Sequence, residues 1–192
     1  MKRPIVGVLA LQGDFREHLA VVTRLGAAGR EIRLPEDLAG IDALIIPGGE
    51  STTIGKLATR FGLIEPIRDL IDGGLTTYGT CAGLIFASST VTEGSQPLLG
   101  VLDVVVQRNA FGRQNESFET DLEIDGFEAP FHAVFIRAPW VEKVGGEVEV
   151  LASVQGHPVM VRQGNIIGTS FHPELTEDDR IHQMLIEMIP GR

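Results

Sequence analysis

The single cysteine of the chain, Cys81, lies in a sequence context typical of a reactive nucleophile. It is the centre of Gly79-Thr80-Cys81-Ala82-Gly83, between the apolar run Leu75 to Tyr78 and the helix-like stretch Leu84 to Ser89. A strand that enters a helix through a sharp turn exposes the central side chain, and the flanking glycines let strand and helix approach closely. The N–H groups at the start of that helix favour a thiolate. The alternative, a buried structural cysteine, does not explain the glycines.

The second candidate reactive group is His172, in Ser170-Phe171-His172-Pro173-Glu174. This stretch follows the strand-like run Asn165 to Thr169, so in an extended backbone His172 and Glu174 point to the same side. Pro173 restricts the backbone on both sides of itself and stiffens the pair. The pattern favours a triad in which His172 takes the proton of Cys81 and Glu174 orients the imidazole. A solvated loop is the alternative for the triplet taken alone.

The other four histidines have weaker chemical cases. His18 falls in the polar part of an amphipathic helix and His182 lies beside acidic residues in the last helix, so we expect both at the surface. His132 and His157 fall in loops or at strand starts, and we expect no second reactive group beside them.

The composition excludes several functional classes. A chain of 192 residues with 43% apolar residues suits a single compact α/β domain spanning residues 1–192. No apolar run approaches the roughly 20 residues that cross a bilayer, and the N-terminus lacks a signal-peptide pattern, so we expect a cytoplasmic protein. The formal net charge of -10 disfavours nucleic acid and membranes as partners. One cysteine excludes an internal disulfide, and a reducing compartment keeps that thiol free.

The first half of the chain alternates strands and helices, which is typical of a parallel sheet covered on both faces. The expected strands are Ile5 to Leu11, Glu31 to Leu34, Ala43 to Ile46 and Leu75 to Tyr78. The expected helices are Asp14 to Leu25 with a capping box of Asp14 and Glu17, a region through Ile54, Leu57 and Phe61, and a helix opened by Pro66. Because ligands bind beyond the carboxyl ends of parallel strands, Gln12-Gly13, residues 47–53 and Cys81 should gather at one rim.

The second half is rich in short β-type runs, which predict an antiparallel extension of the sheet. The expected strands are Val101 to Gln107, Phe118 to Ile124, Phe131 to Ile136, Val148 to Val154, Val159 to Arg162 and Ile166 to Phe171. A final helix is expected from about Thr176 to Ile189, with a start signal at Thr176 and Asp179.

The glycine-rich stretch Pro47-Gly48-Gly49-Glu50-Ser51-Thr52-Thr53 is a candidate oxyanion hole. It lacks the Gly-Lys-Ser/Thr ending of a phosphate-binding loop. Glycines leave N–H groups uncovered, so one from Gly48 or Gly49 and one from Ala82 could converge on a tetrahedral oxyanion. An ordinary strand-to-helix turn is the alternative.

Arg108 and Arg137 are candidate ligands for a substrate carboxylate. Each ends an apolar strand, and the guanidinium fork matches a carboxylate well. A surface ion pair explains an isolated arginine equally well, so the sequence leaves both readings open.

These motifs resemble a known family. Gly79-Thr80-Cys81-Ala82-Gly83 with His172-Pro173-Glu174 resembles the triad glutaminases, or class I glutamine amidotransferases. Further stretches narrow the resemblance to the glutaminase subunit of pyridoxal 5′-phosphate synthase, the PdxT/SNO family: Leu11-Gln12-Gly13, Arg16-Glu17-His18, Pro47 to Thr53, Arg108-Asn109-Ala110-Phe111-Gly112-Arg113-Gln114, Phe135-Ile136-Arg137-Ala138-Pro139 and Ser170 to Thr176. The resemblance runs from Ile5 to the final helix with no departure at a catalytic position. Asp14-Phe15 is taken as a variable stretch of the first loop.

The resemblance implies a flavodoxin-like α/β fold and hydrolysis of L-glutamine to L-glutamate and ammonia, without a cofactor or metal. Cys81 would attack the side-chain amide, His172 would protonate the departing ammonia, and water would cleave the γ-glutamyl thioester. The residues implied to line the glutamine site are Gly48, Gly49, Glu50, Arg108, Ile136 and Arg137, with Gly49 and Ala82 forming the oxyanion hole.

The resemblance also implies a partner, a (β/α)8-barrel synthase subunit that receives the ammonia within a large hetero-oligomer and activates the glutaminase by docking. The sequence leaves three alternative functions open. They are a glutaminase subunit of another amidotransferase such as imidazole glycerol phosphate synthase, a DJ-1-like cysteine hydrolase, and a non-catalytic adaptor.

Overall fold

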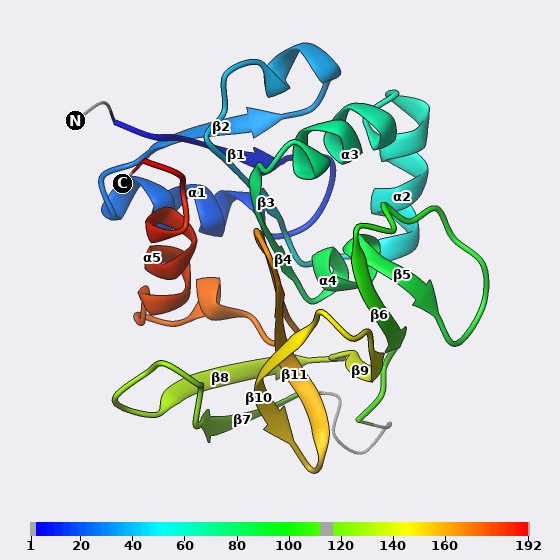
Figure 1. The fold of residues 1–192 in the computed structure, drawn as a ribbon, viewed down its shortest axis with the longest axis vertical. Coiled ribbons are helices and arrows are strands. Elements are labelled where there is room, and N and C mark those ends of the chain that lie inside the picture. The colour runs from blue at the N-terminus through cyan, green and yellow to red at the C-terminus, as the bar shows by residue number, and fades with distance from the viewer. Residues whose placement is uncertain (1–2, 112–116, 192) are drawn as a thin grey trace.

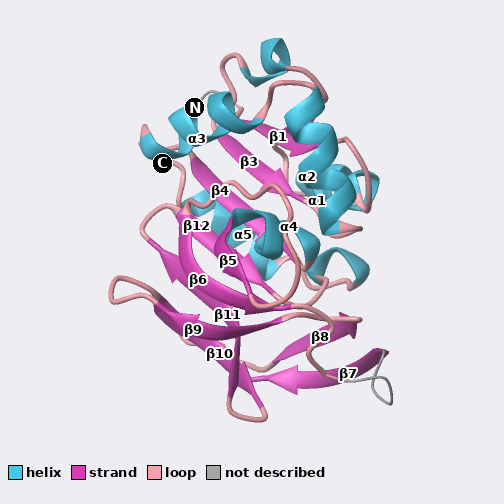
Figure 2. Ribbon diagram, turned by 90° about the vertical axis from the view of Figure 1, so that its right-hand side faces the viewer, coloured by secondary structure: helices cyan, strands magenta, loops and turns pink. Residues whose placement is uncertain are grey.

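The computed structural model describes residues 3–111 and 117–191, and its centre is a seven-stranded sheet with helices on both faces (Figures 1 and 2). In spatial order the strands are β10 (Glu149–Val154), β11 (His157–Gln163), β12 (Ile166–Thr169), β4 (Thr76–Thr80), β3 (Ala43–Ile46), β1 (Ile5–Leu9) and β2 (Ala28–Ile32). From β12 to β2 all neighbours pair in parallel. This is the doubly wound order of flavodoxin-like sheets, so the predicted fold class is confirmed.

The predicted antiparallel extension of the sheet is confirmed. β10 and β11 continue the large sheet with antiparallel pairing to β12. Other strands of the second half form two smaller sheets instead: β5 (Ser88–Val91), β6 (Leu102–Gln107) and β9 (Trp140–Val144) in one, and β7 (Ser117–Leu122) with β8 (Phe131–Ile136) in the other. β5 and β9 were not predicted. β5 follows directly on the short helix before it, and the β9 sequence Trp-Val-Glu-Lys-Val does not alternate between apolar and polar residues.

Two apolar clusters pack against the large sheet. The helices that contribute to them lie on opposite sides of the sheet (Figure 1). The first contains residues of α1 (Phe15–Arg24), α5 (Arg180–Glu187) and β8. The second contains residues of α2 (Ser51–Arg60), α3 (Ile64–Asp72) and α4 (Ala82–Ala87). Within the described ranges none of the helices combines the length and the apolar character that crossing a membrane requires.

Several predicted boundaries are wrong. β2 begins at Ala28, earlier than predicted, because its parallel register pairs Ala28 with Ile5 of β1. α1 begins after Asp14, whose side chain makes no capping hydrogen bond, so the predicted capping box is absent. At the other end of the chain, residues 173–175 form a short 3-10 helix and α5 begins at Arg180, because Asp178 accepts hydrogen bonds from the Arg180 backbone and side chain.

The predicted surface positions of His18 and His182 are also wrong, since both side chains have an exposed fraction of 0%. His18 lies three residues after Phe15 and four before Val22, so the helical period places it on the buried face of α1. His182 lies four residues before Ile186 and is buried in the same way on α5. In both helices the spacing from apolar neighbours, rather than the polarity of histidine, indicates that the side chain is buried.

The turn that carries Cys81 depends on close backbone contacts. A Cβ at Gly83 would overlap the carbonyl oxygen of Ile46, and a Cβ at Gly79 would lie 2.8 Å from the backbone of Gly83. Strand β4, the start of α4 and the end of β3 therefore approach to a distance that no larger residue permits. These glycines bring the cysteine to the carboxyl end of the sheet.

We therefore expect Gly83→Ala to lower the free energy of unfolding by about 1–3 kcal/mol, because the added methyl group forces backbone apart in a packed region. Gly146→Ala is the matched control, since a Cβ there meets no atom within 4 Å. Urea denaturation of both variants measures the difference. Equal stability of the two variants would contradict the close approach of α4 and β3.

Candidate active site

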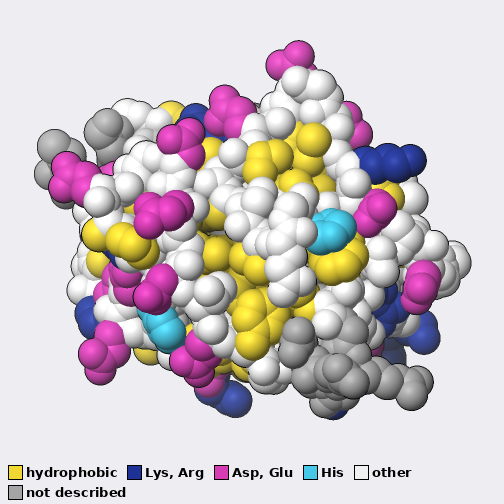
Figure 3. All heavy atoms as spheres, turned by 90° about the horizontal axis from the view of Figure 1, so that it is seen from below, with side chains coloured by type: hydrophobic (Ala, Val, Ile, Leu, Met, Phe, Trp, Pro, Cys, Tyr) yellow, Lys and Arg dark blue, Asp and Glu magenta, His cyan; other side chains and the backbone are white. Residues whose placement is uncertain are grey.

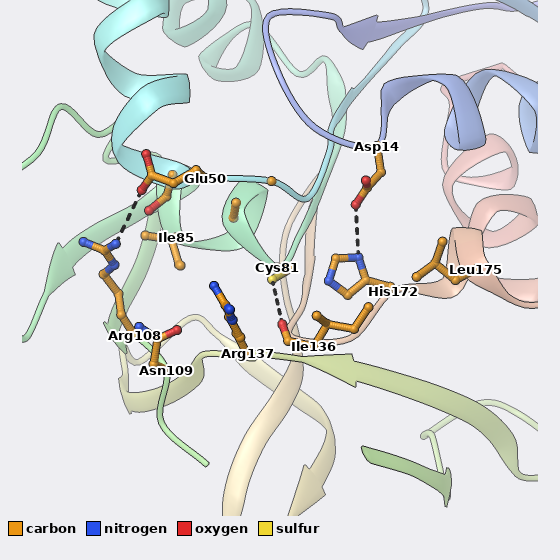
Figure 4. A pocket seen from close by; sticks show the side chains of 13 residues that line it. Asp14, Glu50, Cys81, Ile85, Arg108, Asn109, Ile136, Arg137, His172 and Leu175 are labelled. Atoms are coloured by element: carbon orange, nitrogen blue, oxygen red, sulfur yellow. Dashed lines mark hydrogen bonds and ion pairs between the residues drawn. The ribbon is translucent and has the colours of Figure 1, made fainter. Parts of the chain in front are cut away.

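The predicted residues meet in a pocket of about 390 Å³ at the carboxyl ends of the parallel strands (Figure 4). This volume lies within the range of small-molecule sites. The lining residues are Asp14, Gly49, Glu50, Ser51, Cys81, Ala82, Ile85, Arg108, Asn109, Ile136, Arg137, His172 and Leu175. They come from the ends of β1, β3, β4, β6, β8 and β12 and from the loops and helices that follow these strands, so residues remote in sequence converge on one rim.

Cys81 lies on a strained turn between β4 and α4. Its backbone has φ 50 and ψ -103, and its exposed fraction is 7%. The backbone N–H of Cys81 donates to the carbonyl oxygen of Thr169 at 2.7 Å, which ties the turn to β12. The sulfur lies 4.0 Å from the carbonyl oxygen of Ile136 and faces the pocket (Figure 4). This is the geometry of the nucleophile turn that the glycine spacing predicts.

Backbone strain is concentrated around this pocket. Cys81, Asn109 and Arg137 are non-glycine residues with φ of 50, 45 and 45, and all three line the pocket. Each such residue costs on the order of 1–3 kcal/mol and persists only where the surrounding structure holds it. Asparagine tolerates this backbone region, but cysteine and arginine rarely adopt it, so strain at Cys81 and Arg137 in one pocket favours a functional site. In the sequence Asn109 stands out only as a member of the stretch 108–114.

His172 and Glu174 form a buried pair behind the sulfur. His172 Nδ1 lies 2.7 Å from Glu174 Oε1, and the two side chains have exposed fractions of 5% and 0%. The backbone N–H of His172 donates to the carbonyl oxygen of Val134, which anchors the loop to β8. With Nδ1 held by the carboxylate, Nε2 is left to face Cys81 (Figure 4). The structure thus brings the three predicted triad residues together.

The environment shifts the pKa of both groups. Burial by itself would lower the pKa of His172, but the negative charge and hydrogen bonding of Cys81 and Glu174 outweigh it and raise the pKa to about 10. Burial raises the pKa of the Glu174 carboxyl, and the neighbouring His172 opposes that effect. An imidazole that keeps its proton at neutral pH beside a sulfur nucleophile is suited to donate that proton to a leaving group.

Asp14 is a site residue that sequence reasoning missed. Its Oδ2 lies 3.6 Å from His172 Nδ1, on the pocket side of the imidazole (Figure 4). Its position directly after Gln12-Gly13, at the predicted rim of the sheet, was the feature of the sequence that could have indicated it. Ligand atoms of Asp14, His172 and Glu174 lie within 4.8 Å of one another. A cation there would displace the proton shared by His172 and Glu174, so the triad and a metal are mutually exclusive uses of these atoms.

The glycine-rich loop after β3 contributes to the pocket beside the histidine. Gly49 has φ 146 and lines the pocket, as does Ala82, so both predicted oxyanion-hole residues border the same pocket. Gly48 is outside the lining, because it packs against the His172 ring, where a Cβ would lie 2.5 Å from a ring carbon. Gln12 Oε1 accepts a hydrogen bond of 2.7 Å from the Glu50 N–H, which connects the glycine-rich loop to the loop after β1.

Glu50 caps helix α2. Its carboxylate accepts hydrogen bonds from the backbone N–H groups of Thr52 and Thr53 and from the Thr53 hydroxyl. Partial burial would raise its pKa, but the hydrogen bonds from Thr53 and Thr52 outweigh burial and lower the pKa to about 2. Glu50 therefore stays charged and fixes the start of α2 at the pocket.

The two arginines that line the pocket differ in their ionic partners. Arg108 lies 3.5 Å from both the Glu50 carboxylate and the Thr52 hydroxyl, so its charge is partly matched. Within residues 3–111 and 117–191, no hydrogen bond or ion pair involves the Arg137 guanidinium, which points into the pocket beside Ile136 (Figure 4). Arg137 is therefore the better placed cation for a substrate carboxylate. Gly112, Arg113 and Gln114, quoted in the same motif as Arg108, lie outside the described residues.

His132 and His157 lie outside this pocket. The expectation that His132 has no reactive neighbour is wrong, since its ring nitrogens lie 3.0 Å from Glu119 and 2.9 Å from Asp121 on the exposed hairpin β7–β8. Hydrogen bonds with Asp121 and Glu119 raise its pKa. His157 stacks on Trp140 with ring centroids 3.6 Å apart.

We expect the His172 ring to titrate at lower pH in Cys81→Ala than in the unmodified protein. The reason is that the sulfur is one of two groups that raise its pKa. NMR titration of the histidine rings measures this shift, with His132 as the internal reference because its carboxylate partners are unchanged. An unmoved His172 titration would show that the sulfur and the imidazole do not interact.

Comparison with known proteins agrees with this geometry. A family model described as the SNO glutamine amidotransferase family matches residues 8–190. Proteins named pyridoxal 5′-phosphate synthase subunit PdxT are similar to nearly the whole chain: 57% identical in Parafrankia sp., covering 98% of this chain and 95% of the relative, and 54% identical in Streptomyces avermitilis, covering 98% and 96%. A crystal structure described as a glutamine amidotransferase is similar with a TM-score of 0.92 and 54% identity, covering 96% of this chain and 98% of that one. The chain therefore belongs to the SNO glutamine amidotransferase family.

Proposed function

We propose that Cys81, His172 and Glu174 hydrolyse L-glutamine through a γ-glutamyl thioester, within a single domain of residues 1–192. The enzyme is a glutaminase, and the ammonia that it releases serves the synthesis of pyridoxal 5′-phosphate. The observation that carries the triad assignment is the His172 imidazole, held through Nδ1 by Glu174 at 2.7 Å with its other nitrogen toward the strained cysteine.

The first step is attack of the Cys81 sulfur on the carbonyl carbon of the substrate amide. A new C–S bond forms, and the electron pair of the C=O bond moves to oxygen. The N–H groups of Gly49 and Ala82 are the proposed donors to that oxyanion, because both residues line the pocket together with Cys81. Losing one such donor costs on the order of a hundredfold in kcat.

The remaining steps depend on proton transfer by His172. The imidazolium donates its Nε2 proton to the amide nitrogen, the C–N bond breaks, and ammonia leaves. The neutral imidazole then takes a proton from water, whose oxygen attacks the thioester. Collapse of this second tetrahedral intermediate breaks the C–S bond, releases glutamate and returns the thiolate and imidazolium. Glu174 stabilises the positive ring throughout.

The charges around the pocket suit the two ends of an amino acid. Arg137 is the proposed partner of the substrate α-carboxylate, since its guanidinium has no other ionic partner among the described residues. Glu50 and Asp14 offer carboxylates that suit the α-ammonium group. Gly48, Arg108 and Ile136 complete the proposed glutamine site by shaping the wall, with Gly48 acting through the His172 ring rather than by direct contact.

The enzyme works with a synthase partner subunit. We propose in addition that this subunit is a (β/α)8 barrel in a large hetero-oligomer and that ammonia reaches it through an enclosed path. The physical reason for such a path is that ammonia released into water near neutral pH is mostly protonated and no longer nucleophilic.

We expect Cys81→Ala to abolish ammonia release while the fold and the docking of the partner remain, because only the sulfur is lost. Mass spectrometry after incubation with an electrophilic glutamine analogue should show one adduct at Cys81 in the unmodified protein and none in the variant. Undiminished ammonia production by Cys81→Ala would exclude the thioester mechanism.

We expect Glu174→Gln to reduce kcat less than His172→Ala does, because orienting a base is a smaller contribution than supplying one. Steady-state ammonia production at saturating glutamine, with the partner present, ranks the two variants. The reverse ranking would mean that the roles of the two residues are misassigned.

A further inference from the structure

Two buried histidines that the proposed mechanism does not use lie directly behind Glu174. His18 Nε2 is 3.6 Å from Glu174 Oε2, the oxygen that does not face His172. His18 Nδ1 in turn is 2.8 Å from His182 Nε2. Both histidines have an exposed fraction of 0%. Residues of α1, α5 and the 173–175 turn thus form one line of polar groups that ends at the triad.

The unpaired atoms of this line point to an unfinished hydrogen bond. Glu174 Oε2 and His18 Nε2 are both buried and have no hydrogen-bond partner in the described part of the chain. Their separation of 3.6 Å is too long for a hydrogen bond, but a small rotation of the Glu174 carboxyl shortens it. A buried carboxylate oxygen without a donor is costly, and His18 Nε2 is the polar atom that faces it.

The protonation of the two rings follows from their burial. Burial, together with the charges of His182 and His172, lowers the pKa of His18 well below its ordinary value. Burial also lowers the pKa of His182 to about 4, with Asp179 opposing and Arg24 adding to the effect. Both rings are therefore neutral near neutral pH, and each has one donor and one acceptor nitrogen.

Only one arrangement of the two protons suits the charge of Glu174. If His18 Nδ1 donated to His182, the lone pair of His18 Nε2 would face the carboxylate oxygen, and His182 Nδ1–H would be a buried donor without a partner. If His182 Nε2 donates to His18 Nδ1 instead, His18 Nε2–H points at Glu174. The second arrangement replaces a repulsion with a charge-assisted hydrogen bond.

We propose that His18 is a positioning residue that donates Nε2–H to Glu174 Oε2, and that His182 fixes His18 in the tautomer that can do so. Glu174 then receives one hydrogen bond on each oxygen, from His172 on one side and His18 on the other. This keeps the carboxyl charged and aimed at His172 despite its burial. The proposal rests on the triad function proposed above.

Tyr78 and a few titratable groups surround this network. The Tyr78 ring lies edge-on to both histidine rings, with centroids 6.1 and 5.8 Å away, and its hydroxyl is paired with Thr169 at 2.8 Å. The titratable and charged groups that face the network are His172 and Asp14 on the pocket side, Tyr78 on β4, and Asp179 and Arg24 beside His182.

The test compares two substitutions of His18 in the complex with the partner subunit. His18→Gln places an amide N–H near the former Nε2, whereas His18→Phe keeps the ring volume and has no donor. We expect His18→Phe to lower kcat about 10- to 100-fold with KM little changed, as expected for the loss of a hydrogen bond to a charged group. His18→Gln should retain most of kcat.

The pH profile separates positioning from a structural role. Loss of the donor leaves the Glu174 carboxylate less stabilised and raises its pKa further, so the acidic limb of kcat should move to higher pH in His18→Phe but not in His18→Gln. In a Glu174→Gln background the same His18→Phe change should cost little more. Leu185→Ala on α5 is the control for destabilisation alone, because this buried side chain belongs to the apolar cluster and not to the network.

An equal fold-loss for His18→Phe with and without Glu174, or an unmoved acidic limb, would overturn the proposal. If His18→Phe does not fold, His182→Phe replaces it, with the same shift of the limb expected because the His18 tautomer is released. Labelling of Cys81 by the glutamine analogue distinguishes the two levels of failure. If the unmodified protein forms the adduct at Cys81 but His18→Phe does not change kcat, only the positioning role of His18 is contradicted. If the unmodified protein forms no adduct, the triad itself is contradicted.

Discussion

The hydrogen bond between His172 and the buried Glu174 carboxylate is the interaction on which the site depends. A carboxylate in an apolar environment is unstable unless its oxygens are paired, and here one oxygen lies 2.7 Å from the imidazole. Together with the nearby sulfur, this carboxylate raises the pKa of His172 to about 10, so the ring keeps its proton. Cys81, His172 and Glu174 therefore form a single electrostatic unit, in which the pKa of His172 depends on both of its neighbours.

That unit exists only because backbone segments approach one another closely. Gly13 and Gly48 belong to different loops, yet a Cβ at Gly13 would overlap the Gly48 carbonyl group. Gly83 presses on the end of β3 in the same way. Small residues at these crossings let three loops reach the same rim. The strained backbone at Cys81, Asn109 and Arg137 is held there by the strands that precede these residues, which belong to three different sheets. The fold stabilises conformations that no local segment would adopt alone.

The parts of the fold that could be predicted were those with a strong local signal. The buried strand at residues 43–46 agrees in its bounds with β3, because four apolar residues end at a proline. β2 was misplaced, since Gly29 and Arg30 do not resemble a strand and only pairing with β1 defines it. The small sheets were missed as separate sheets, because strand partners far apart in sequence leave no local trace.

For the site, the residue types around Cys81 and His172 were enough to propose a nucleophile, a base and its carboxylate, since each belongs to a short motif with its own geometric reason. Only the tertiary structure decided which other polar groups meet them. His18 and His182 reach Glu174 because α1 and α5 pack on the same face of the sheet, and burial there changes a histidine from a solvated side chain into a neutral hydrogen-bonding group. Asp14 reaches His172 from the loop after β1. Local sequence encodes the chemical identity of a group, whereas its charge state and its partners depend on the elements that pack around it.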